Sequence, residues 1–123
     1  MLSDLITMND STDRAADDPD RATVAFTLAM AAIGSEQETV VFLSSDGVHL
    51  AIAGAADDIA EPGFTPLAEL MQKFVAAGGL IYVCLPCFNK RGLDEAKVVP
   101  GAAIVGGPKL VAFMAPGASS ISY

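Results

Sequence analysis

Two cysteines, Cys84 and Cys87, hold most of the chain's capacity for chemistry, and only two residues separate them. A cysteine is a nucleophile only as its thiolate, and neighbouring cations lower a thiol pKa from about 8.5 toward roughly 3.5–7.5. Lys90 and Arg91, the only adjacent pair of basic residues in the chain, follow in the same segment. The spacing predicts a reactive thiol at Cys84, with Cys87 as a second catalytic candidate and the two cations as binding residues.

The residues around the cysteines predict a strand that runs directly into a helix. The apolar run at residues 80–83 is typical of a strand that is covered on both faces. Pro86 cannot extend a central strand but fits the first turn of a helix. Cys84 is therefore expected at the carboxyl end of a strand, where open α/β sheets bind ligands and where a helix amino terminus stabilises a thiolate. The alternative is that both cysteines are small, inert core residues.

The C-x-x-C spacing of Cys84 and Cys87 permits other kinds of chemistry as well. A thiol–disulfide pair of the thioredoxin type also has Pro before its second cysteine, but the strand–helix alternation of this chain continues differently. A zinc site would need further ligands, and the chain has no second cysteine pair and only one histidine, His49. We therefore expect no metal.

A turn after an earlier predicted strand supplies further candidate binding residues. Residues 38–43 predict that strand, and Asp46, Gly47 and His49 follow it. His49 lies beyond a strand's carboxyl end, so it is a candidate to pair with Cys84 and activate the thiol. Arg91 is a candidate to pair with an acid or to orient an anionic group, and the alternative is a charge at a helix carboxyl end.

The other elements predict an alternating order of strands and helices. The helix at residues 21–33, with a start at Asp18 and Pro19, is apolar nearly all round and should be mostly buried. The order predicts an α/β fold, a three-layer α/β/α sandwich with a mainly parallel five-stranded sheet. The expected strands are residues 2–8, 38–43, 80–84, 102–105 and 119–123, and the expected helices are residues 21–33, a short piece within 48–62, 67–77, 86–91, 94–99 and 107–115, with a loop at 9–17.

Length and composition limit the possible classes of protein. The 123 residues predict a single domain over residues 1–123. Hydrophobic residues make up 52% before the 11 glycines are counted, and the mean hydropathy is +0.46. This apolar share predicts that part of the surface is hidden against other copies of the chain. The net charge of −8 argues against nucleic acid as a partner, and the absence of a nucleotide-binding glycine motif predicts no cofactor.

From the sequence we expect neither a membrane span nor a signal peptide. Uncharged stretches are interrupted by Gly or Pro and stay below the ~18 residues of a spanning helix. The amino terminus has Asp4 and no positively charged region. Two cysteines without a disulfide framework suit a reducing compartment, so we expect a cytoplasmic protein.

The sequence resembles the DsrE/DsrF-like family, which includes the subunits of the bacterial TusBCD sulfur relay. The segment from Val83 and Cys84 to Gly92 is the most specific part of the resemblance, because it matches the family's central strand, cysteine and downstream Arg-Gly. The other parts are Asp18-Pro19-x-Arg21-Ala22, the segment from Val41 to Val48, and Val99-Pro100-Gly101-Ala102 with Val105-Gly106.

The resemblance implies a DsrEFH-like fold and assembly into homotrimers, homohexamers or hetero-assemblies. It also implies that Cys84 carries sulfane sulfur as a persulfide between donor and acceptor proteins. Cys87 has no counterpart in the sulfur-relay subunits, and it could resolve the persulfide as a disulfide. The alternative hypothesis is a non-catalytic oligomeric module that binds a small ligand or a partner and has structural cysteines. Fast alkylation of Cys84 at neutral pH would favour the first hypothesis.

Overall fold

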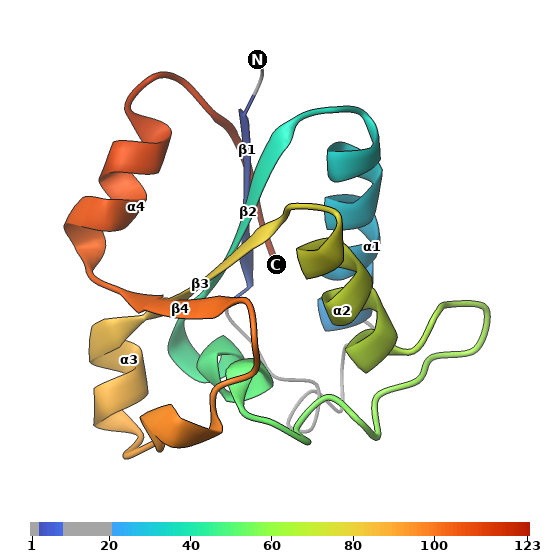
Figure 1. Ribbon diagram of the computed structural model, residues 1–123, viewed down its shortest axis with the longest axis vertical. Coiled ribbons are helices and arrows are strands. Elements are labelled where there is room, and N and C mark those ends of the chain that lie inside the picture. Colours follow the sequence, from blue (N-terminus) through green and yellow to red (C-terminus); the bar gives the residue numbers. More distant parts are fainter. Residues whose placement is uncertain (1–2, 9–20) are drawn as a thin grey trace.

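The computed structural model describes residues 3–8 and 21–123 and is built on a parallel sheet (Figure 1). All five strands run parallel, in the spatial order β4-β3-β2-β1-β5. The strand that ends in Cys84 is β3, which lies between β2 and β4 rather than at an edge. The strands are β1 (Ser3–Met8), β2 (Glu38–Leu43), β3 (Leu80–Cys84), β4 (Ala102–Val105) and β5 (Ser119–Ser122).

Helices lie on both faces of this sheet, as predicted. Figure 1 shows α1 and α2 on one face and α4 on the other. The three-layer α/β/α class is thereby confirmed, and the sheet is parallel throughout rather than mainly so. The helices are α1 (Arg21–Gly34), α2 (Leu67–Ala76), α3 (Leu85–Lys90) and α4 (Gly107–Met114), with two 3-10 helices, η1 (Ser45–Ala51) and η2 (Glu95–Lys97).

The main core lies between the sheet and the pair α1 and α2. Phe26 of α1 and Phe74 of α2 meet edge to face, with ring centroids 5.9 Å apart, a geometry that aromatic pairs prefer. Strand residues such as Ile81 and Val83 of β3 close this core from the sheet side. Because this core packs directly against β3, it fixes the strand whose carboxyl end is Cys84.

The opposite face has a thinner cover. Leu5, Val40 and Tyr82 are buried there, and Leu110 and Phe113 of α4 pack against them. No side chain of α4 is itself fully buried. Helix α4 therefore covers this face of the sheet, but its own side chains remain partly exposed.

Helix α1 departs from the prediction that it is mostly buried. Its inward side is buried, but Leu28 is 38% exposed and Ala31 is also exposed. The physical reason is that α1 borders an open groove beside β5 instead of a further packed element. The predicted loop at residues 9–17 and the predicted helix start at Asp18 and Pro19 lie outside the described residues. Among the described residues, no helix has the length and apolar character needed to cross a membrane.

Candidate functional site

The junction of β3 and α3 places both cysteines at the carboxyl edge of the sheet. Cys84 ends β3 with an extended backbone (φ −64°, ψ 116°) and directly precedes α3, in whose first two positions a proline lies. Val83 pairs with Leu43 of β2, and Cys84 pairs with Val105 of β4. Cys84 therefore lies level with the residue that follows β2, at the edge where ligands bind in such sheets.

The two thiols are neighbours. Both cysteines are free and half-buried, and a side-chain hydrogen bond joins Cys84 and Cys87. The first turn of α3 brings Cys87 back toward Cys84, because residues three apart on a helix share a face. The predicted pair is therefore a physical pair, with its sulfur atoms within reach of each other.

Ser45, at the start of η1, is a site residue that the sequence analysis missed. Its backbone N–H donates a hydrogen bond to Cys87. Ser45 has a left-handed backbone (φ +50°), which is uncommon outside glycine and is found where the surrounding structure enforces it. The turn is held in place because the Ser44 N–H donates to the Met8 carbonyl at 3.0 Å and the Gly47 N–H donates to the Ser44 carbonyl at 2.9 Å.

Arg91 ties α3 to η1. Its Nε and Nη2 both donate to Oδ1 of Asp46, at 3.1 and 3.0 Å. Its Nη1 donates to the carbonyl oxygen of Cys87 at 3.1 Å. Arg91 therefore forms the predicted ion pair with an acid, and that acid is Asp46. The guanidinium is therefore held beside Cys87 by contacts on both of its sides.

The surroundings of the two thiols shift their pKa values in opposite directions. Burial raises the pKa of Cys84, and the hydrogen bond and charge of the Cys87 side chain raise it further, against the opposing effects of a hydrogen bond from the Cys87 backbone and of the Arg91 charge. Burial also raises the pKa of Cys87, but the hydrogen bond from Cys84, the Ser45 N–H and the charges of Arg91 and Lys90 together lower it below its ordinary value. Of the two thiols, Cys87 is therefore the more acidic. The Cys87 backbone in the first turn of α3 favours a Cys84 thiolate, as expected of a helix start, but burial and the Cys87 side chain outweigh it.

The remaining predicted binding residues differ in their exposure and in their effect on the thiols. Lys90 is exposed and contributes its charge to Cys87, whereas Gly47 is buried within η1. His49 lies in η1 and is half-buried, but it is not among the described groups that shift the pKa of either thiol. Over residues 3–8 and 21–123, no cluster of three or more His, Cys, Asp or Glu side chains is placed to hold a metal ion.

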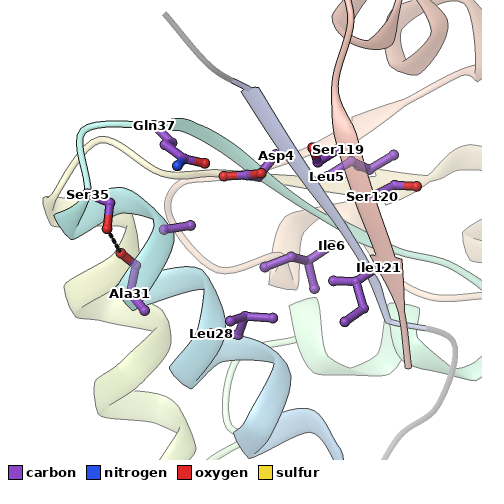
Figure 2. Close-up of a pocket in the computed structure, with 11 residues that line it drawn as sticks. Asp4, Leu5, Ile6, Leu28, Ala31, Ser35, Gln37, Ser119, Ser120 and Ile121 are labelled. Carbon is purple, nitrogen blue, oxygen red and sulfur yellow. Dashed lines mark hydrogen bonds between the residues drawn. The ribbon is translucent and has the colours of Figure 1, made fainter.

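Two apolar grooves lie apart from the cysteines. The groove that we call the α2 groove has a volume of about 500 Å³, and Leu50, Met71, Val75 and Ile81 line it together with the polar Gln72. The second, which we call the β5 groove, has a volume of about 330 Å³ and lies between α1, β1 and β5. Figure 2 shows Leu28, Ile6 and Ile121 on its apolar side and Asp4 and Gln37 at its polar end. None of the predicted site residues lines either groove.

Comparison with known proteins gives consistent matches. The DsrE/DsrF-like family model matches residues 10–123. Two proteins of Methanocaldococcus jannaschii, uncharacterized proteins MJ0760 and MJ0989, are each 30% identical to this chain, over 95 and 96 residues or 77% of it. The chain spans only 34% of the length of MJ0760 but 80% of MJ0989.

Solved structures match the fold at low sequence identity. The ychN protein from E. coli superposes with a TM-score of 0.76 at 16% identity and covers 99% of this chain and 100% of its own. MTH1491 from Methanobacterium thermoautotrophicum superposes with a TM-score of 0.70 at 12% identity, over the full length of both chains. At these identities the two structures are evidence for the fold alone.

Proposed function

The chain belongs to the DsrE/DsrF-like family, and on that premise we propose that it handles sulfur, with Cys84 carrying sulfane sulfur as a persulfide. The observation that carries the proposal is the position of Cys84, at the carboxyl end of β3 with a second thiol hydrogen-bonded to it. Donor and acceptor proteins, self-assembly and a cytoplasmic location are parts of the same proposal.

The proposed loading step uses both thiols. Cys87, the more acidic of the two thiols, in its thiolate form takes the proton of Cys84 through their hydrogen bond. The Cys84 thiolate then attacks the outer sulfur of a donor persulfide, R–S–SH. A new S–S bond forms on Cys84, the donor's S–S bond breaks, and the donor leaves as the thiolate R–S⁻. The product is Cys84–S–SH beside a protonated Cys87, which returns its proton to the departing thiolate or to water.

Quantifying bound sulfane sulfur tests this proposal. Wild type, Cys84→Ser and Cys87→Ser are incubated with glutathione persulfide at mildly alkaline pH, so that Cys84 ionises even without Cys87 as its base. After the donor is removed, cyanide converts bound sulfane sulfur to thiocyanate. We expect about one thiocyanate per chain from Cys87→Ser and none from Cys84→Ser, in line with thiolate-dependent persulfidation. Equal yields from both variants, or none from Cys87→Ser, would contradict the proposal.

A second candidate function, a small-ligand binding module, has support from the α2 groove. Its volume and mainly apolar lining, with few polar groups, are typical of ligand pockets. Ala76 lines this groove, whereas its exposed neighbour Ala77 does not. If the groove binds ligands, Ala76→Trp abolishes the fluorescence gain of an anilinonaphthalene sulfonate probe and Ala77→Trp preserves it. No fluorescence gain with wild type would remove this candidate.

A further inference from the structure

The surroundings of Cys87 are more elaborate than a passive neighbour of a sulfur carrier requires. Its sulfur accepts hydrogen bonds from the Cys84 thiol and from the N–H of Ser45. Its carbonyl oxygen accepts a hydrogen bond from Arg91 at 3.1 Å. Arg91 is in turn fixed by its two contacts with Asp46. Three elements, β3, α3 and η1, therefore combine to hold one sulfur atom in place.

This arrangement lowers the pKa of a thiol directly beside Cys84. The left-handed backbone of Ser45 turns a donor toward Cys87, and such a conformation is kept only where the structure enforces it. The ion pair of Arg91 with Asp46 keeps a cation close to Cys87. A thiolate fixed against another cysteine is placed to attack whatever that cysteine carries.

We propose that Cys87 is the attacking group that ends the carrying cycle, by displacing hydrosulfide from the persulfide on Cys84. The inference rests on the proposed function, because it requires sulfur to be loaded on Cys84 first. In the step, the Cys87 thiolate attacks Sγ of Cys84–S–SH. The bond between the two cysteine sulfurs forms, the bond between Sγ and the outer sulfur breaks, and the outer sulfur leaves as HS⁻ with its proton.

The electron balance identifies the partner that turnover needs. The sulfane sulfur is reduced to sulfide, and the two cysteine sulfurs are oxidised to a disulfide. The protein therefore supplies both electrons, and a dithiol reductant is required to restore Cys84 and Cys87. The attack is directed at Sγ rather than at the outer sulfur because Sγ is the atom that already contacts Cys87.

A single-turnover experiment tests the inference. Wild type and Cys87→Ser are mixed with equimolar glutathione persulfide without reductant, and released hydrosulfide and intact mass are followed over time. Cys84→Ser provides the background of hydrosulfide from donor decay. Wild type should release about one hydrosulfide per chain and lose the mass of two hydrogen atoms. Cys87→Ser should keep the mass of one added sulfur and release hydrosulfide only at the background rate.

Two variants of Arg91 separate charge from folding. Arg91→Gln removes the cation beside Cys87 and should slow hydrosulfide release by about threefold to tenfold. Arg91→Lys keeps the charge and should retain most of the rate. Equal slowing in both variants would mean that the charge does not act on the attacking thiolate.

The outcomes distinguish this inference from the proposed function. If both wild type and Cys87→Ser gain one sulfur and keep it, the carrier proposal stands and the attack by Cys87 is wrong. If Cys87→Ser releases hydrosulfide as fast as wild type, the attack by Cys87 is also wrong. If neither protein gains sulfur, the carrier proposal fails and the release step fails with it.

Discussion

At the scale of single residues, the two thiols are chemically different although they are three positions apart. Cys84 ends β3, and its pKa is raised by burial and by its hydrogen bond with Cys87. The Cys87 pKa is lowered because the hydrogen bonds from Cys84 and Ser45 and the charges of Arg91 and Lys90 together outweigh the effect of burial. The first thiol to react with a simple electrophile need not be the one that carries sulfur.

This difference predicts which cysteine iodoacetamide labels first. Because only the thiolate reacts, Cys87 should be labelled at a pH below that of an ordinary cysteine, whereas Cys84 should need a higher pH. Peptide mass mapping after brief exposure, between about pH 6 and pH 9, measures both profiles. Arg91→Gln should move the Cys87 profile to higher pH. Preferential labelling of Cys84 throughout this range would show that the charge distribution described here is wrong.

The sequence offered the two cysteines, Asp46 and Arg91 as candidate site residues, and the structure brings them together in an arrangement that the sequence did not indicate. Spacing alone places Cys84 and Cys87 together, because residues at a strand end and in the first helical turn are necessarily close. The pairing of Arg91 with Asp46 joins residues 45 positions apart and depends on the sheet register. Ser45 could not be predicted, because nothing in a serine indicates a left-handed backbone whose N–H reaches Cys87.

At the scale of elements, the position of β3 depends on the close packing of α2 against the chain that precedes this strand. Gly79 is buried and donates its N–H to the Phe74 carbonyl at 2.9 Å. A Cβ atom at Gly79 would overlap the ring of Phe74, which also meets the ring of Phe26 edge to face. Glycine is needed here for space and not for an unusual backbone angle.

Gly79→Ala should therefore lower the free energy of unfolding by about 1–3 kcal/mol, the usual effect of overpacking a core. Gly34→Ala is the matched control, because a Cβ atom at Gly34 meets nothing within 4 Å. In the control, the free energy of unfolding should stay the same or rise by up to about 1 kcal/mol. Urea denaturation midpoints measure both effects. A Gly79→Ala protein as stable as the control would mean that Phe74 can move away at no cost.

The elements themselves were largely predictable, whereas their exposure was not. Helix α2 lies within its predicted range of residues 67–77, and its apolar residues share one buried side, namely Leu67, Leu70, Met71 and Phe74. Helix α1 has similar composition all round, yet its side toward the β5 groove is exposed (Figure 2). Composition indicates which side chains of a helix could be buried, but the topology of the fold decides which of them have a packed neighbour.

At the scale of the whole molecule, the apolar composition leaves exposed hydrophobic side chains on α4. Val111 is 63% exposed and Met114 is 40% exposed. Figure 1 shows α4 on the face opposite to α1 and α2. Exposed apolar side chains that lie together on one helix are typical of surfaces that bind another protein. We expect a second copy of this chain to cover them, consistent with the proposed self-assembly.

The double variant Val111→Glu, Met114→Glu should therefore convert an oligomeric wild type into monomers, because buried unpaired carboxylates are costly. A control with Ala55→Glu and Ala77→Glu adds the same charge at exposed positions away from α4. Sedimentation velocity distinguishes the forms. A monomeric wild type, or a double variant that stays oligomeric, would remove α4 as the self-association surface.

The central claim concerns Cys84 alone, so the most direct measurement uses a chain in which Cys84 is the sole thiol. The intact mass of Cys87→Ser is recorded before and after exposure to glutathione persulfide, and again after a thiol reductant. The account predicts the gain of one sulfur atom, located on the peptide that contains Cys84, and its loss on reduction. An unchanged mass, with Cys84 still open to alkylation, would contradict the assignment of this chain as a sulfur carrier.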